Sequence, residues 1–219
     1  MSQPLNEQRI KRLLTRHIKS GDWRRSDALI SEYFVENASR RADLVAVNGT
    51  LRAYEIKSDV DHLTRLSGQI DVYSRYFESV IVVCTRRHLA SVLQQTDSWI
   101  GVLCVSNEGI EEHRATAIRQ LTDSNAWLSH LPITAIRNAL SRRGIKSPKN
   151  NRQDILEVAR SHMNSEEARS EAMRYLRTQK AKQRRTLEQE RTMNMTSDPL
   201  ADHKAMLQSY LRSRGIAFC

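Results

Sequence analysis

Apolar residues recur at helical spacing in three stretches of the N-terminal half. The segment Leu5–Ile18 places apolar residues three and four positions apart among basic ones, which predicts an amphipathic helix. A second helix is expected over Ala28–Glu36, because Ser26 or Asp27 can cap its N-terminus. A third is expected over Thr64–Phe77, where the same spacing returns.

Apolar runs of a different kind predict strands. Asp43–Val47 and Leu51–Lys57 flank the turn-forming dipeptide Asn48-Gly49 and are expected to form a hairpin. The remaining expected elements are strands at Val80–Cys84, Ile100–Val105 and Ile110–Arg114 and a helix over Arg87–Gln95. Strands that alternate with helices indicate the α/β class, with a mixed β-sheet flanked by helices.

The pattern changes after about residue 116, where the strand signals stop. Short helices are expected over Ile133–Ser141 and Arg152–Ser161, a long basic helix from Glu166 to about Thr192, and a last helix over Ala201–Arg214. We therefore divide the chain into an α/β core (1–118), a helical module (119–165) and a basic helical tail (166–219). The region after the core is predicted to be all-α.

Charge sharpens this picture. The 219 residues carry a formal net charge of +10, and nearly all of the excess lies after residue 130. A basic excess of this kind favours nucleic acid, DNA first, as the partner and argues against a membrane. The chain has neither a secretory signal pattern nor an apolar stretch of the roughly 20 residues needed to cross a bilayer. Its Cys84 and Cys104 lie in apolar runs, so we expect free buried thiols and a cytoplasmic protein.

The far end of the predicted hairpin carries three charged residues. Glu55 and Lys57 are two apart on one strand and therefore share a face, and Asp43 begins the neighbouring strand. A two-residue turn would pair Asp43 with Tyr54 and separate the carboxylates. A three-residue loop with Gly49 in a left-handed conformation would pair Asp43 with Glu55.

Two carboxylates held close together repel unless a cation lies between them, and a small set of hard oxygen ligands suits Mg²⁺. A neighbouring lysine can orient a metal-bound water and neutralise charge that builds up on a phosphate. Taken without further context, the same three residues are also compatible with a solvated sheet end.

Asp43 followed across a hairpin by Glu55-Ile56-Lys57 resembles the metal-site motif of the PD-(D/E)XK nuclease superfamily, which has the restriction-endonuclease-like fold. The resemblance implies a core made of a helix, a three-stranded meander, a helix and a further strand. It implies that Asp43 and Glu55 bind Mg²⁺, or Mn²⁺ as a substitute, with Lys57 as the catalytic lysine. The Ile56 carbonyl is a further candidate ligand. A first-helix glutamate completes the family's site, and it maps onto Glu32, which we favour, or Glu36.

Gln69-Ile-Asp-Val-Tyr73 resembles the Q-x-x-x-Y box of the RecB-like branch, in which both side chains face the site. Their i, i+4 spacing places them on one helix face. More narrowly, residues 26–115 resemble a small bacterial and phage family of nuclease-like proteins, sometimes called sce-type, of unassigned role. The proline that often precedes the superfamily's aspartate is Ala42 here.

The segment ITAIRNALSRRGIKSPKNNRQDILEVA is similar to the SAP-type helix–extension–helix, with Asn150 or Asn151 as a helix cap. That resemblance implies contacts with the DNA backbone through Arg142, Arg143, Lys146, Lys149 and Arg152. The sequence thus predicts a Mg²⁺-dependent DNA nuclease with a basic region that holds DNA. The alternatives are a non-catalytic DNA-binding protein and a partner-dependent subunit on the same fold, and a homodimer or a protein partner is compatible with each.

Overall fold

A computed structural model describes residues 5–35, 40–149 and 151–178. Its sheet and connecting helices follow the chain in the order α1 (Glu7–Ser20), β1 (Ala28–Val35), β2 (Arg40–Val47), β3 (Leu51–Lys57), the 3₁₀ turn η1 (Leu63–Arg65), α2 (Leu66–Tyr76), β4 (Ser79–Thr85), α3 (Arg86–Gln95), β5 (Gly101–Val105) and β6 (Ile110–Arg114). Helices α4 (Ser124–Ser129), α5 (Ile133–Arg142) and α6 (Arg152–His162) follow, and residues 165–178 are helical as well. The tail's remainder, with the predicted helix Ala201–Arg214, lies outside the described residues.

The six strands form one mixed sheet in the order β1-β2-β3-β4-β5-β6. Strands β1 to β3 are an antiparallel meander, β3, β4 and β5 run parallel, and β6 returns antiparallel to β5. This confirms the predicted α/β class, with a mixed sheet flanked by helices and followed by a helical region.

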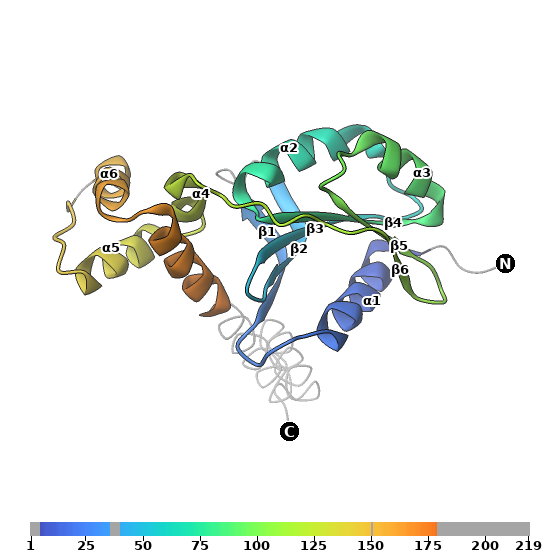
Figure 1. Ribbon diagram of the computed structural model, residues 1–219, viewed down its shortest axis with the longest axis horizontal. Coiled ribbons are helices and arrows are strands. Elements are labelled where there is room, and N and C mark those ends of the chain that lie inside the picture. Colours follow the sequence, from blue (N-terminus) through green and yellow to red (C-terminus); the bar gives the residue numbers. More distant parts are fainter. Residues whose placement is uncertain (1–4, 36–39, 150, 179–219) are drawn as a thin grey trace, which may run out of the picture. The chain divides into compact units, whose positions relative to one another are not determined.

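Helices cover both faces of the sheet (Figure 1), and each face has its own apolar core. On one face, Ile10 and Leu14 of α1 pack on residues of the central strands that include Tyr54 and Val83. On the other, α2 and α3 pack on alternate residues of the same strands, with Tyr73 fully buried. The residues that alternate along β2 to β4 therefore feed two cores, as expected for a sheet buried on both sides.

The larger core continues into the helical region. Trp127 of α4, Leu140 of α5, Ile155 of α6 and Leu176 of the helix at 165–178 belong to the same buried cluster as the α2 face of the sheet. Arg169 adds a polar link, since its Nε lies 2.7 Å from the buried carboxylate of Glu78, next to β4. Apolar packing therefore joins α4, α5, α6 and the helix at 165–178 to the sheet, and an ion pair adds to it.

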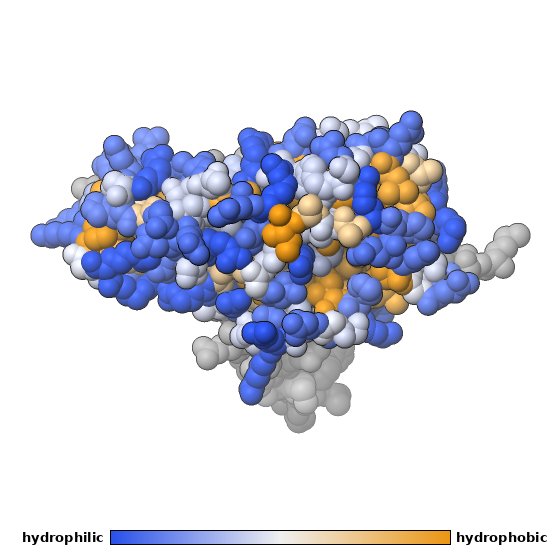
Figure 2. Space-filling view, in the orientation of Figure 1, coloured by the Kyte–Doolittle hydropathy of each residue, from blue (hydrophilic) through white to orange (hydrophobic). Residues whose placement is uncertain are grey.

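The outer surface of this body is polar. In the view of Figure 2 it is mostly hydrophilic, with small and separated apolar areas. The large apolar side chains exposed among the described residues are Phe34, Val60 and Ile118. No helix in the described part of the chain is long and apolar enough to cross a membrane. Cys84 and Cys104 are buried free thiols, as predicted.

One predicted element is wrong. Residues 28–35 form strand β1 at the sheet edge and not the second helix that the sequence suggested. The segment ALISEYFV contains β-branched and aromatic residues, which fit a half-buried strand. It pairs with β2 from Ala28 opposite Val47 to Val35 opposite Arg40. Pairing with the next strand of the chain, β2, decided between two local patterns that a short apolar run leaves open.

Candidate active site

The connection between β2 and β3 sets the positions of the charged residues. Val47 pairs with Leu51, so that Asn48, Gly49 and Thr50 form a three-residue loop. Gly49 has a φ of +90°, a conformation that glycine adopts with little strain. Leu44 pairs with Tyr54, and the same register brings Asp43 opposite Glu55. The three-residue loop, which was predicted as the alternative that pairs Asp43 with Glu55, is confirmed.

Strands β1 and β2 both change the face they bury at one point. Ala28 and Ile30 precede Glu32, and Tyr33 and Val35 follow it, yet all four pack on the core that α2 covers. Alternation therefore breaks at Glu32, whose φ of +55° is unusual for a residue with a side chain. Such irregularities re-aim side chains and are frequent beside active sites.

The break in β2 falls at Asp43, opposite Glu32. Its carboxylate Oδ2 accepts a hydrogen bond of 2.7 Å from the Ile56 backbone N–H. This side-chain bond lies just beyond Leu44, where the backbone pairing of β2 with β3 ends. Asp43 is thereby fixed to the strand that carries Glu55 and Lys57.

Glu55 and Lys57 lie on the face covered by α2, and α2 supplies two partners for them. Glu55 Oε1 accepts from Lys57 Nζ at 2.8 Å and from Gln69 Nε2 at 2.5 Å, and Glu55 Oε2 lies 2.9 Å from the Tyr73 hydroxyl. Lys57 Nζ also donates to Gln69 Oε1 at 2.9 Å. The structure thus brings together Glu55, Lys57, Gln69 and Tyr73, four of the predicted site residues.

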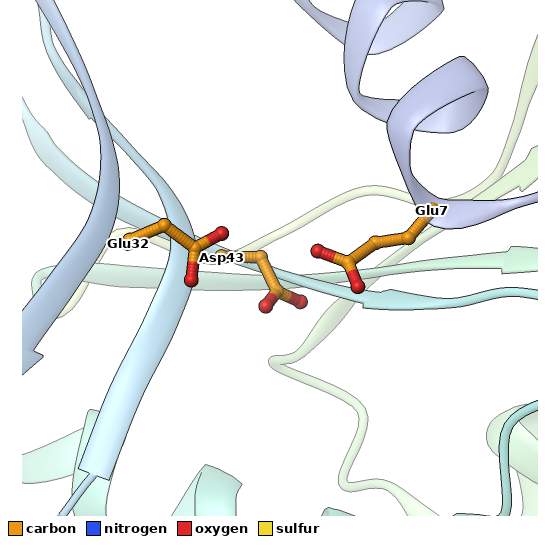
Figure 3. A group of neighbouring side chains, drawn as sticks. All are labelled: Glu7, Glu32 and Asp43. Carbon is orange, nitrogen blue, oxygen red and sulfur yellow. The ribbon is translucent and has the colours of Figure 1, made fainter. Parts of the chain in front are cut away.

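The first-helix glutamate needs a correction. Glu32, the favoured residue, lies on strand β1, because the predicted helix there does not form, and Glu36 lies outside the described residues. The first helix of the structure is α1, and its first turn carries Glu7. Carboxylate oxygens of Glu7, Glu32 and Asp43 lie within 4.8 Å of one another, and Figure 3 shows Glu7 reaching from α1 toward Asp43. The sequence signal was present, since Glu7 is the one acidic residue in the helix predicted at Leu5–Ile18.

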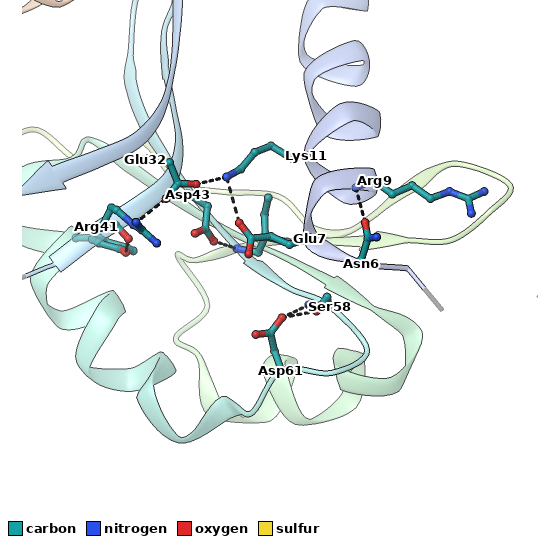
Figure 4. Close-up of polar contacts among 11 residues, drawn as sticks. Asn6, Glu7, Arg9, Lys11, Glu32, Arg41, Asp43, Ser58 and Asp61 are labelled. Atoms are coloured by element: carbon teal, nitrogen blue, oxygen red, sulfur yellow. Dashed lines mark hydrogen bonds and ion pairs between the residues drawn. The ribbon is translucent and has the colours of Figure 1, made fainter. Parts of the chain in front are cut away.

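Glu32 is engaged by two cations (Figure 4). Lys11 Nζ bridges the Glu32 and Glu7 carboxylates, and Arg41 Nε lies 2.7 Å from Glu32 Oε2. Glu32 reaches Asp43 from β1, whereas Glu7 reaches it from α1. Among the described residues, Glu32 therefore serves to hold Lys11, and Lys11 in turn holds Glu7.

A cavity of about 510 Å³ opens beside these residues. We call it the carboxylate cavity. Its walls include Glu7, Asp43, Glu55, Ile56 and Lys57 but not Glu32. The lining also includes Asp61 and the arginines Arg40, Arg41 and Arg65. Four carboxylates, one ammonium and three guanidinium groups therefore line one cavity, and a divalent cation and a phosphate require groups of these kinds together.

The ionisation of Asp43 reflects this crowding. Burial, followed by the negative charge of Glu55, raises the pKa of Asp43 to about 7, although the Ile56 N–H opposes the shift. The charge of Lys11 also opposes the shift, but burial and the neighbouring carboxylates outweigh it. Among the described residues, Glu7, Glu32 and Asp43 bring carboxylate oxygens close enough together to hold one metal ion, and oxygen ligands of this kind suit Mg²⁺. Glu55 and Ile56 line the same cavity as Glu7 and Asp43. Burial also raises the pKa of Tyr73, which keeps its hydroxyl a neutral donor.

The segment after β3 ties α1 to the cavity. Asp61 Oδ2 accepts from the Ser58 backbone N–H at 2.8 Å, and Asp59 Oδ2 accepts from the Leu5 backbone N–H at 3.1 Å. His88 Nε2 lies 3.0 Å from the Ser58 carbonyl. These bonds fix the start of α1, and with it Glu7, against the end of the strand that bears Lys57.

The residues predicted to bind DNA in the helical module have mixed surroundings. Helix α6 begins after Asn151, whose side chain accepts a hydrogen bond from the Gln153 N–H. Asn151 is therefore the helix cap, which is one of the two predicted alternatives. Arg142 and Arg143 both bind the carboxylate of Glu171, at 2.7 and 2.9 Å. Their charge is thus partly used inside the protein. Lys146, Lys149 and Arg152 are exposed.

Comparisons with known proteins place these features in context. The model of the family described as bacteriophage P4 protein cII matches residues 1–203. Protein cII of Enterobacteria phage P4 is 39% identical over 103 residues, which are 47% of this chain and 39% of that protein. The match therefore spans less than half of this relative. A solved structure of a protein of unknown function from Silicibacter pomeroyi is similar with a TM-score of 0.43 and 19% identity, over 62% of this chain and 90% of that one.

Proposed function

The chain belongs to the bacteriophage P4 protein cII family, and from this premise and the carboxylate cavity we propose that it is a Mg²⁺-dependent DNA nuclease. The observation that carries the proposal is the position of Lys57. Its ammonium is buried, bound to Glu55 and Gln69, and lies on the wall of a cavity that also presents Glu7 and Asp43. A lysine beside a divalent-metal ligand set is the equipment of metal-dependent phosphodiester hydrolysis.

Each residue has a proposed part in binding or orientation. Glu7, Asp43 and Glu55 hold Mg²⁺ or Mn²⁺, with the Ile56 carbonyl as a further ligand. When bound, the metal supplies a Lewis acid for the phosphate and lowers the pKa of a bound water. Lys57 orients the attacking water and neutralises charge on the phosphate. Gln69 and Tyr73 hold Glu55, and Glu32 positions Glu7 through Lys11.

Two further features support this proposal. The element order α1, meander, α2, β4 is the order that the PD-(D/E)XK resemblance implies. The Q-x-x-x-Y residues Gln69 and Tyr73 both contact Glu55, and Glu55 faces the cavity. DNA is the proposed substrate because the chain carries a net charge of +10.

The test is a gel assay on plasmid, linear duplex and single-stranded DNA in Mg²⁺, Mn²⁺ or EDTA. Wild type should cut only with metal, and Asp43→Ala and Lys57→Ala should each lose at least about 100-fold in rate. Exposed Asp71→Ala and Lys19→Ala change the same charges away from the cavity and should cut like wild type. DNA that is shifted on the gel but never cut would make the chain a non-catalytic binding protein. Neither cutting nor shifting would favour a subunit that needs a partner.

A further inference from the structure

A second cavity, of about 800 Å³, lies between the end of α2, the segment at 119–123, α4 and α6. We call it the arginine groove. Its described lining residues share no member with the carboxylate cavity. Three arginines from three different parts of the chain line it, namely Arg75 from α2, Arg119 from the segment at 119–123 and Arg152 from α6. All three are exposed.

The groove has an excess of positive charge. Among its described lining residues the one carboxylate is that of Asp123, which caps α4 by accepting from the Asn125 N–H at 2.8 Å. Neither Arg119 nor Arg152 forms an ion pair within the described part of the chain. This contrasts with Arg142 and Arg143, which share Glu171. A phosphate is therefore a better counter-ion for the groove than for those two residues.

An aromatic ring orients one of these arginines. The Arg119 guanidinium carbon lies 4.5 Å from the centroid of the Trp99 ring, and the Arg119 backbone N–H donates to the Glu78 carbonyl. A cation–π contact fixes a guanidinium while leaving its charge and its edge donors available for an anion. The remaining wall offers amides and a hydroxyl on Gln120, Asn125, Gln153 and Thr122, which can donate to phosphate and sugar oxygens.

We propose that the arginine groove binds the sugar–phosphate backbone of nucleic acid, independently of metal and of any cleavage. Gln69 at the carboxylate cavity and Tyr76 at the groove are seven residues apart on α2, about 10 Å along the helix axis. A duplex covers that length in about three base pairs. Contacts with the backbone give affinity that falls with salt and selects weakly for sequence.

Binding is measured by fluorescence anisotropy on the full chain, with a labelled 20-base-pair duplex and a 20-nucleotide strand, in EDTA so that nothing is cut. The double variant Arg119→Gln/Arg152→Gln should weaken binding at least about tenfold and lower the slope of log K against log salt by about 2. The matched control Arg12→Gln/Arg16→Gln removes two exposed arginines of α1 and should stay within about threefold of wild type.

Equal losses in the two double variants, or unchanged binding by the groove variant, would overturn the proposal. So would equal competition from polyglutamate of matched charge, which would indicate an acidic polypeptide as the occupant. Arg152→Glu serves as a second variant, because a carboxylate at the start of α6 suits the helix N-terminus and should not disturb folding. Its affinity should fall further than that of Arg152→Gln. A wild-type chain that binds DNA in EDTA through the groove but cuts no DNA with metal would refute the proposed nuclease and leave the groove proposal in place.

Discussion

Asp43 connects the stability of the fold to the chemistry of the carboxylate cavity. Its pKa is about 7 in the folded protein, against 3.8 for an ordinary aspartate. A carboxyl group whose pKa is raised by folding favours the folded state at low pH, and that contribution is lost as pH rises from about 4 to about 7. The cavity therefore stores a cost of ionisation that a bound cation would relieve.

Asp43→Asn should remove this cost. The variant should match wild type in melting temperature near pH 4 and exceed it increasingly up to about pH 7, with a constant difference above that. Saturating Mg²⁺ or Mn²⁺ should raise the melting temperature of wild type at pH 7.5 more than at pH 5.5, because metal and proton compete for the same carboxylate. Thermal unfolding followed by circular dichroism measures both. A pH-independent difference between variant and wild type would refute the raised pKa.

The proposed function gives Glu7 and Glu32 different roles, Glu7 as a metal ligand and Glu32 as a support for Glu7. Glu7 faces the carboxylate cavity, whereas Glu32 is held by Lys11 and Arg41. Glu7→Gln should therefore weaken Mn²⁺ binding about tenfold or more, and Glu32→Gln should weaken it less. Titration calorimetry with Mn²⁺ compares the two, with exposed Glu108→Gln as the control. The reverse order of losses would make Glu32 the ligand.

Sequence reasoning reached Asp43, Glu55, Lys57, Gln69 and Tyr73 because spacing within one strand or one helix fixes which of them share a face. It placed Glu32 on a helix that does not form, and it did not single out Glu7, whose carboxylate lies near those of Glu32 and Asp43. No spacing rule relates Glu7 to Asp43, since contact between them depends on how α1 crosses the sheet. Lys11 was not singled out either. Its i,i+4 spacing from Glu7 is a common surface pair, and its contact with Glu32, 21 residues away, depends on how α1 crosses the sheet.

At the scale of elements, the β2–β3 loop and α2 each contain a glycine, and the two differ in backbone conformation. Gly49 has a positive φ, whereas Gly68 is helical. Gly49→Ala should lower stability by about 1 to 2 kcal/mol, since its φ of +90° is costly for a residue with a Cβ. Gly68→Ala should raise stability by about 0.5 to 1 kcal/mol, because Gly68 lies in α2 and a Cβ there would approach nothing closer than Arg40 Nη2 at 3.9 Å. Urea denaturation measures both, and equal signs would contradict the assigned conformations.

The hairpin and the edge strand show why some elements follow from sequence and others do not. Asn48-Gly49 is a local signal, and the requirement that Asp43 and Glu55 share a face selected the three-residue loop from two alternatives. Strand β1 has no such local signal. Its pairing with β2 and the flip at Glu32 arise only when both strands are present, and this pairing overrode the helix predicted over Ala28–Glu36.

At the scale of the whole described body, the large core makes the sheet and the helical region one structural unit. Tyr73 beside the carboxylate cavity and Leu140 in α5 belong to the same buried cluster. A cluster that crosses from sheet to helices predicts that both parts unfold together. The arginine groove, formed by α2, α4 and α6, would then be only as rigid as that shared core.

The ion pair between Arg169 and Glu78 tests this coupling. Glu78 is buried, accepts from the Leu51 N–H at the start of β3, and binds Arg169, whose Nη2 also donates to the Gly49 carbonyl.

Arg169→Met should lower the free energy of unfolding by about 1 to 3 kcal/mol, because it removes the cation from a buried carboxylate. If the sheet and the helices unfold together, the fluorescence of Trp127 in α4, followed in a Trp23→Phe/Trp99→Phe background, and far-ultraviolet circular dichroism should shift to the same new midpoint. Arg160→Met on the exposed side of α6 is the control and should leave both midpoints unchanged. Two separate transitions in Arg169→Met would instead show a helical module that unfolds independently of the α/β core.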